Sequence, residues 1–259
     1  MRVGRRTWVA VAAGCALVVA VVVAWPHVQA YTGVAPPKQF DQRVAVDPAL
    51  ASDYAPVLGV AHNAGNNPET TAAALSAGAD VVEIDVISAR GTLVAGRQKP
   101  FPWLAGLVFR GPSLADAWDY ADGARIVKLD LKQDDRPFLD DLVAFLRERA
   151  GSRQVMVSTP DADALVYLHQ RLPRVTLLLS VNSPDGVRSL QASAALQSAV
   201  GGVSAWQGLV DRNLLAWAHQ RHLVVLAWTV NDGTRMNQLV GLGVDGITTA
   251  NLAVLRALR

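Results

Sequence analysis

Two acidic residues, Glu83 and Asp85, interrupt an apolar run that extends from residue 81 to residue 87. On a β-strand, residues two positions apart project to the same face, because successive side chains alternate sides. Two like charges on one face of an apolar strand are costly unless positive charge lies between them. A divalent cation is the usual solution, so this pair predicts a metal site.

Other residues able to do chemistry follow the same pattern. His62 comes directly after an apolar run, and Asp130 and Lys132 are again two positions apart in a strand-like segment. With Glu83 and Asp85, Asp130 gives three carboxylates, which suit one hard cation, Mg²⁺ or Ca²⁺, and leave positions for substrate oxygens. A lysine ammonium suits a phosphate, and a neutral histidine can exchange a proton. The set predicts phosphodiester chemistry, although Asp130 and Lys132 alone fit a buried ion pair equally well.

The elements that must position these residues alternate regularly. Strand patterns begin near residues 57, 81, 125, 154, 175, 201, 223 and 244, and a helical pattern separates each from the next. Strict alternation predicts parallel strands, and this number of them predicts a closed (β/α)8 TIM barrel of the α/β class. An open doubly wound sheet is the alternative, but no Gly-x-Gly-x-x-Gly follows the first strand. We expect an irregular insert over 89–112 and one helix over 184–198.

The composition is that of a slightly apolar globular protein, with 51% hydrophobic and 18% charged residues in a chain of 259. The formal charge of +2 comes from basic residues within the first 40, and no basic stripe predicts binding to nucleic acid. Cys15 is the only cysteine, which excludes internal disulfides and a cysteine-based metal site.

Residues 1–30 have the pattern of a targeting segment. Three arginines precede an uncharged run over 7–25, which is about long enough to span a bilayer. The segment is either a signal peptide cut after Ala30 or an uncleaved membrane anchor with its basic end inside. Both interpretations predict an extracytoplasmic domain, secreted or anchored to the cell membrane. Residues 31–56 predict a linker, and residues 57–259 predict the barrel.

Eight segments, in order along residues 57–259, resemble the motifs of the glycerophosphodiester phosphodiesterases: A-H-N-A-G-N-N-P-E-T-T, G-A-D-V-V-E-I-D-V, G-T-L-V, P-S-L-A-D-A-W, K-L-D-L-K, V-M-V-S-T, W-T-V-N and G-V-D-G-I-T-T. The resemblance implies a metal-dependent barrel that splits glycerophosphodiesters into an alcohol and glycerol 3-phosphate, with lysophospholipids as further candidate substrates. It also implies site roles. The metal ligands would be Glu83, Asp85 and Asp130, with His62 as an acid/base residue and Lys132 as a phosphate contact.

Three departures from the family pattern affect the site. Asn63 replaces the arginine of the first motif, and Glu69 lies in a Pro-Glu-Thr-Thr that replaces Pro-Glu-Asn-Thr, which leaves its role open. By count, Arg97 and Gln98 stand where the family has a second catalytic His and its Asp neighbour. An arginine binds an anionic oxygen but cannot exchange a proton near neutral pH, and a missing acid/base partner costs roughly 10²- to 10⁴-fold in rate. We expect Asn63, Arg97 and Trp228 to contact the substrate.

These departures leave other functions open. One is a catalytically impaired barrel that binds phospholipid head groups or phosphodiesters without turnover. Another is a phospholipase similar to the sphingomyelinase D enzymes, which share the His, Glu-x-Asp and Asp-x-Lys arrangement. A third is a barrel that acts on a different phosphorylated substrate. The apolar segment 101–109 is either a membrane-contacting lip or a loop packed over the barrel.

Overall fold

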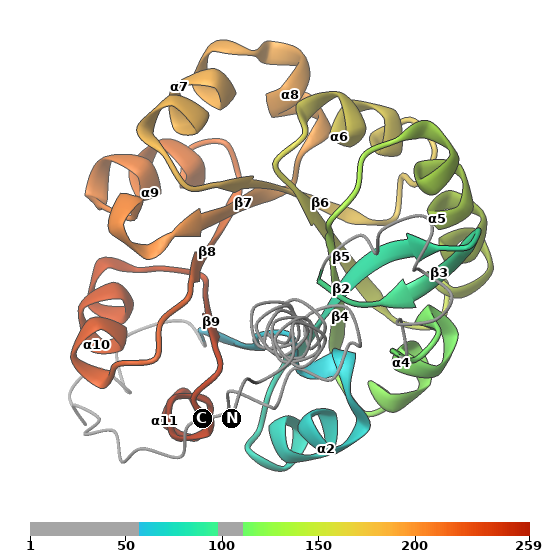
Figure 1. Cartoon of the computed structure of the whole chain (residues 1–259). Coiled ribbons are helices and arrows are strands. Elements are labelled where there is room, and N and C mark those ends of the chain that lie inside the picture. The colour runs from blue at the N-terminus through green and yellow to red at the C-terminus, as the bar shows by residue number, and fades with distance from the viewer. Residues whose placement is uncertain (1–56, 98–110) are drawn as a thin grey trace, which may run out of the picture.

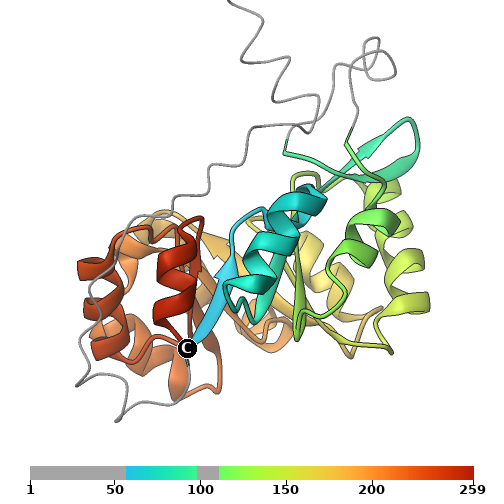
Figure 2. The ribbon, with the colours of Figure 1, turned by 90° about the horizontal axis from the view of Figure 1, so that it is seen from below.

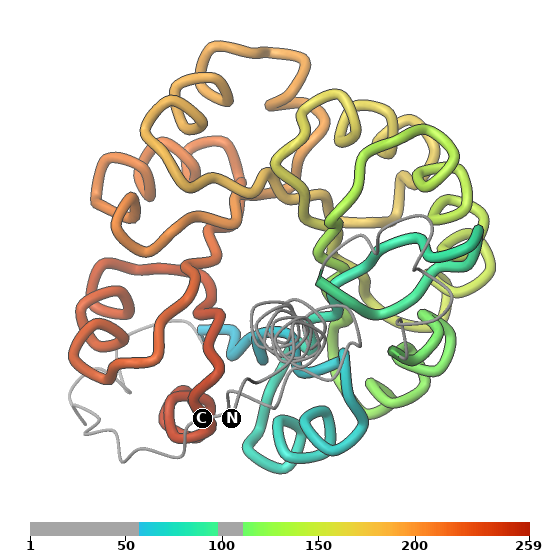
Figure 3. Tube along the Cα trace, viewed as in Figure 1, coloured from blue at the N-terminus to red at the C-terminus, as the bar shows by residue number. Residues whose placement is uncertain are grey.

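The computed structural model describes residues 57–97 and 111–259, and its centre is a closed barrel of parallel strands surrounded by helices (Figure 1). The barrel strands are β1 (Leu58–Ala61), β2 (Val81–Ala89), β4 (Ile126–Leu131), β5 (Gln154–Thr159), β6 (Thr176–Val181), β7 (Gly202–Trp206), β8 (Val224–Trp228) and β9 (Gly246–Thr249). β1 closes the barrel because it pairs in parallel with both β2 and β9 (Figure 3). The predicted (β/α)8 TIM barrel is confirmed.

Nine α-helices and two short 3₁₀-helices are described, and the α-helices form the outer ring (Figure 1). They are η1 (Ala64–Asn66), α2 (Pro68–Ser76), α4 (Leu114–Tyr120), α5 (Arg136–Arg149), α6 (Ala162–His169), α7 (Pro184–Ala192), α8 (Ala194–Ala199), η2 (Gln207–Leu209), α9 (Arg212–His219), α10 (Gly233–Leu242) and α11 (Leu252–Ala257). At each of the α-helices described, a serine, aspartate or asparagine at the N-cap accepts a backbone N–H of the first turn. These caps determine the residue at which each α-helix begins.

A hairpin replaces part of the insert that we expected to be irregular. β3 (Thr92–Ala95) pairs antiparallel with the last residues of β2 and extends the hairpin beyond the carboxyl end of the barrel (Figure 2). Arg90 and Gly91 form the connection, and both have positive φ, of 54° and 69°. A two-residue loop in which both residues have positive φ matches the twist of the flanking strands, which is why a hairpin forms here.

The single helix expected over 184–198 is wrong, because the segment forms two helices, α7 and α8. Ser193 interrupts it with an extended backbone, at φ −103° and ψ 103°. Its side chain then accepts the backbone N–H of Leu196 and starts α8. A serine that bonds to nearby backbone competes with helix continuation, which helical periodicity alone does not reveal.

The interior of the barrel is apolar at its base and polar toward its mouth. The layer nearer the amino ends of the strands is apolar and contains Val60, Val81, Ile126, Met156, Leu178 and Leu226. Side chains on a strand repeat every two residues, so the next inward positions form a second layer toward the carboxyl ends. These positions are His62, Glu83, Lys128, Ser158, Ser180 and Trp228. The same alternation therefore separates a packed base from a polar mouth.

Several expectations concern residues outside the part of the chain that the structure describes. The targeting segment over 1–30, the linker over 31–56, the apolar segment 101–109 and Gln98 all lie there. Within residues 57–97 and 111–259, no helix is both long enough and apolar enough to cross a membrane.

Candidate functional site

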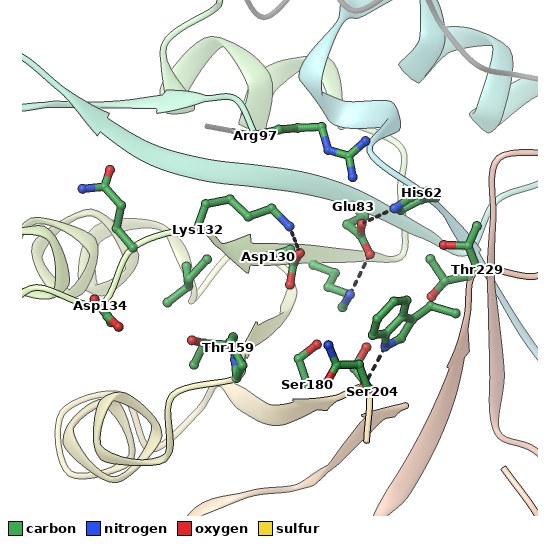
Figure 4. A pocket seen from close by; sticks show the side chains of 17 residues that line it. His62, Glu83, Arg97, Asp130, Lys132, Asp134, Thr159, Ser180, Ser204 and Thr229 are labelled. Carbon is green, nitrogen blue, oxygen red and sulfur yellow. Dashed lines mark hydrogen bonds and ion pairs between the residues drawn. The ribbon is translucent and has the colours of Figure 1, made fainter. Parts of the chain in front are cut away.

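A cavity of about 500 Å³ opens at the carboxyl ends of the barrel strands. Charged side chains from β1, β2 and β4 and the loops that follow line one side of it (Figure 4). Hydroxyl, amide and indole groups at the ends of β5 to β9 line the opposite side. The two sides therefore differ in chemistry, because one is charged and the other is polar but uncharged.

Three carboxylates converge at the charged side. One oxygen from each of Glu83, Asp85 and Asp130 can be chosen so that all three lie within 4.8 Å of one another. Glu83 and Asp85 are buried, and Asp130 is partly buried. Oxygens at this spacing fit the coordination sphere of one hard divalent cation, whose ligand distances are roughly 2.0–2.6 Å. The structure thus brings together the three residues that the sequence singled out as metal ligands.

Basic side chains already contact these carboxylates. Lys128 Nζ lies 2.6 Å from Glu83 Oε2, and Lys132 Nζ lies 2.9 Å from Asp85 and also pairs with Asp130. Each carboxylate therefore has a lysine partner. The structure places Lys132 in the ion pairs that the sequence left open, and its side chain remains 25% exposed at the cavity.

Sequence reasoning missed Lys128, although a signal was present. Lys128, Asp130 and Lys132 occupy alternate positions in the segment K-L-D-L-K, so all of them face the same way from the end of β4. Only the last two were singled out. The side chain of Lys128 is 3% exposed, which makes it the most enclosed basic group of the site.

A short loop after β1 holds Asp85 in place. Asn66 donates its amide N–H to Asp85 Oδ2 at 2.8 Å, and its amide oxygen accepts the Asp85 backbone N–H at 2.9 Å. Gly65 allows this approach, because a Cβ there would lie 2.3 Å from Ile84 Cγ1. Nothing in the sequence pattern identified Asn66, since its partner lies 19 residues away.

Asn63 lies among the carboxylates and has a left-handed backbone, with φ 56°. With its amide nitrogen turned toward the acids, it donates to Glu83 at 3.0 Å and to Asp85 at 2.9 Å. In that orientation its oxygen accepts from His62 and Arg97, each at 3.2 Å. The predicted contact between Asn63 and substrate stays a prediction, whereas its contacts with both acids are part of the site.

The acids and lysines shift one another's pKa values in different directions. Burial, reinforced by the charges of Glu83 and Asp130, raises the pKa of Asp85 above its ordinary value even though Lys132 opposes this. Burial also acts to raise the pKa of Asp130, but Lys128 and Lys132 outweigh it and the pKa is lowered. Burial acts to lower the pKa of Lys128, and the nearby carboxylates outweigh it and raise that pKa. Further positive charge would therefore stabilise the ionised form of Asp85.

His62 and Arg97 lie at the mouth of the charged side (Figure 4). His62 Nε2 lies 3.7 Å from Glu83 Oε1, and the imidazole is 23% exposed. Arg97 Nε lies 3.4 Å from Asp85 Oδ2, and the side chain is 51% exposed. His62 is the only histidine among the described residues that line the cavity. Glu69 is exposed in the first turn of α2 and does not line the cavity.

The opposite side of the cavity is polar but uncharged. Trp228 donates its indole N–H to the Ser204 carbonyl at 2.9 Å, which fixes the ring against the wall. Ser180 and Thr248 line the same wall. The Thr248 hydroxyl is buried and has no hydrogen-bond partner among the described residues. A buried hydroxyl is normally paired, so Thr248 is an unsatisfied polar group in this wall.

A family model described as the glycerophosphoryl diester phosphodiesterase family matches residues 116–254, which is more than half of the chain. The chain belongs to this family. The matched range contains Asp130 and Lys132, while His62, Glu83 and Asp85 precede it. The family resemblance implied by the sequence is confirmed, and the chain is an enzyme of the glycerophosphodiester phosphodiesterase class.

Solved structures show the same fold at low sequence identity. An Oleispira antarctica phosphodiesterase in complex with the product sn-glycerol-3-phosphate is 18% identical, with a TM-score of 0.65 over 78% of this chain and 96% of that one. A Parabacteroides distasonis glycerophosphodiester phosphodiesterase is 18% identical, with a TM-score of 0.60 over 76% and 94%. A calcium-dependent phosphoinositol-specific phospholipase C from Pseudomonas is 12% identical, with a TM-score of 0.52 over 80% and 94%. Comparison with curated proteins gave no match.

Proposed function

We propose that this protein hydrolyses glycerophosphodiesters to an alcohol and glycerol 3-phosphate with the help of a divalent cation, Mg²⁺ or Ca²⁺. The observation that carries the proposal is the convergence of Glu83, Asp85 and Asp130 at the wall of the cavity that His62 also lines. The three carboxylates would hold the ion. A bound divalent cation supplies Lewis-acid polarisation of a phosphoryl oxygen and neutralises charge that develops in the transition state.

Lys132 and Arg97 are suited to bind the phosphodiester anion. Both are partly exposed and line the cavity, and both currently contact Asp85. A lysine ammonium offers a point charge, and an arginine offers a planar set of donors that can bind two oxygens together. These two side chains would hold the phosphate group near the carboxylates. Their positive charges would balance the negative charge of the diester.

His62 would exchange the proton that the reaction requires. Its ring lies at the cavity mouth beside Glu83, which can orient the imidazole. By count, Arg97 stands where the family has a second catalytic histidine. An arginine keeps its proton near neutral pH and cannot take over that role. We infer that a single group, His62, carries out the proton transfers for which the family has two histidines. Substrates whose leaving group needs no proton should therefore be hydrolysed fastest.

The uncharged wall supports a hydroxylated substrate. Ser180 and Thr248 offer hydroxyls, and Trp228 offers an apolar face against which a glycerol carbon chain can pack. The related Oleispira antarctica structure contains sn-glycerol-3-phosphate, a molecule with this combination of phosphate and hydroxyl groups. Glycerophosphodiesters and lysophospholipids both carry it, so both are proposed as substrates.

Release of glycerol 3-phosphate from glycerophosphocholine, or of acylglycerol 3-phosphate from a lysophospholipid, tests the proposal directly. The purified protein is incubated with glycerophosphocholine or a lysophospholipid in the presence of Mg²⁺ or Ca²⁺, and the products are identified by mass. We expect turnover that EDTA abolishes and that Glu83→Gln lowers strongly. Equal turnover by wild type and Glu83→Gln would refute the proposal. Turnover of sphingomyelin without turnover of glycerophosphocholine would instead indicate phospholipase chemistry similar to that of the sphingomyelinase D enzymes.

A non-catalytic barrel that binds phosphodiesters is the second candidate. It is favoured by Arg97, which cannot exchange a proton, and by the contacts of Asn63 with the carboxylates. It predicts metal-dependent binding of glycerophosphocholine, measured by calorimetry, without product formation over hours. Detectable metal-dependent turnover excludes it.

We also propose that the domain works outside the cytoplasm, because of the basic and apolar pattern of the first 30 residues. Expression of the full chain, followed by fractionation and mass determination of its N-terminus, distinguishes the two forms. A mature N-terminus at residue 31 indicates a cleaved signal peptide. An intact N-terminus in the membrane fraction indicates an anchor, and recovery from the cytoplasm contradicts the proposal.

A further inference from the structure

Lys128 is the basic residue of the cavity that the proposed reaction does not use. It lies on β4 one layer above the apolar base, and its side chain is almost completely enclosed. Its Nζ donates to Glu83 Oε2 at 2.6 Å. An ammonium this deep cannot reach a substrate at the mouth, so its role must concern the acids around it.

The site contains equal numbers of acidic and basic groups in contact. Glu83, Asp85 and Asp130 supply three negative charges. Three positive charges face them, because Lys128 pairs with Glu83, Lys132 pairs with Asp85 and Asp130, and Arg97 lies beside Asp85. A divalent ion that enters this set must therefore compete with basic side chains for oxygens that are already partnered.

The basic residues differ in their freedom to move away. Lys132 and Arg97 are partly exposed and can turn toward solvent or toward a phosphate when an ion binds. Lys128 has no such route, because its side chain is 3% exposed. Moving a buried ammonium away from its carboxylate would leave a buried charge unpaired, which is strongly unfavourable.

We propose that Lys128 is a built-in cation that shares Glu83 with the divalent ion, so that the protein binds this ion more weakly than its three carboxylates alone would. The inference rests on the proposed metal site and adds a residue that sets its affinity. Like charges repel more strongly inside a protein than in water, so the effect of one fixed ammonium beside the ion is large. Lys128 also keeps Glu83 neutralised and in position when no ion is bound.

Calcium affinity is the direct test. Ca²⁺ is titrated by calorimetry at about pH 8, where carboxylates are ionised, into wild type, Lys128→Met and the matched control Arg212→Met. Arg212 is exposed at the start of α9, so its loss removes one positive charge far from the cavity. We expect Lys128→Met to bind Ca²⁺ at least about tenfold more tightly than wild type, and Arg212→Met to bind it equally. Unchanged or weaker binding by folded Lys128→Met overturns the inference.

Two further variants keep the test decisive. Lys128→Gln removes the charge but retains an N–H donor for Glu83, and it should tighten Ca²⁺ binding as Lys128→Met does. If Lys128→Met is too unstable for calorimetry, its melting temperature is measured at increasing Ca²⁺ concentrations. A rise in melting temperature no larger than that of wild type overturns the inference. Asp85→Asn identifies the site, because it should remove Ca²⁺ binding in either background. Absence of Ca²⁺ binding by both wild type and Lys128→Met would instead refute the proposed metal site, and the inference with it.

Discussion

Replacement of His62 by asparagine tests the centre of the proposed mechanism. The imidazole lies at the cavity mouth, where it contacts Glu83 across 3.7 Å and is 23% exposed. The backbone N–H of His62 bonds to the Thr249 carbonyl at 2.8 Å, and this bond remains in His62→Asn. The substitution therefore removes a proton-exchanging group and leaves the closure of the barrel intact.

The expected loss follows from the absence of a substitute. General acid–base catalysis by one side chain contributes roughly 10²- to 10⁴-fold, which is about 2.7–5.5 kcal/mol in the activation barrier. No other histidine lines the cavity in the described part of the chain, and Arg97 retains its proton. We expect kcat/KM of His62→Asn to fall by about 10²-fold or more, while Ca²⁺ affinity changes little.

The assay compares wild type, His62→Asn and His169→Asn. His169 ends the outer helix α6 and is exposed, so it provides the same substitution away from the cavity. Initial rates are measured with glycerophosphocholine and with a glycerol phosphodiester that has a nitrophenolate leaving group. If His62 protonates the leaving oxygen, the deficit shrinks with the second substrate; if it activates water, the deficit persists. A folded His62→Asn with kcat/KM within about threefold of wild type would refute the role assigned to His62.

Three further predictions concern neighbouring residues. Arg97→His should raise kcat/KM by about tenfold or more, because it places a second proton-exchanging ring beside Asp85; no gain in a folded variant would contradict this. Gly65→Ala should lower the free energy of unfolding by about 1–3 kcal/mol, because its Cβ would lie 2.3 Å from Ile84, whereas Gly151→Ala meets nothing within 4 Å and serves as the control in denaturant melts. The carboxylates raise the pKa of Lys132 above 10.5 despite its burial. Its stabilisation is thus complete below pH 10.5 and is lost as pH rises toward the folded-state pKa. Wild type should lose more stability than Lys132→Met between about pH 9 and about pH 11.5, and parallel losses would contradict the assignment.

The sequence by itself determined the barrel and half of the cavity. Regular alternation of strand and helix patterns is enough to predict a (β/α)8 barrel, because parallel strands need helical crossovers. The period of two along each strand placed Glu83 and Asp85 on one face, and Asp130 on the equivalent face of the next barrel strand. Local backbone geometry also explains the two errors. The Arg90–Gly91 turn and the capping role of Ser193 depend on single residues rather than on periodicity.

Only the tertiary structure decided which charges meet. β2 and β4 are neighbours in the barrel, and their register places Glu83 opposite Lys128 and Asp85 opposite Asp130. This register cannot be predicted from either segment of the sequence alone. That register turns a strand lysine into the buried partner of Glu83, and the loop after β1 brings Asn66 to Asp85. The carboxylate pair therefore predicts a cation, but barrel closure determines that basic side chains already share its charge. Pairing across strands is a long-range property, and for this reason the electrostatic state of the site could be read only from the folded chain.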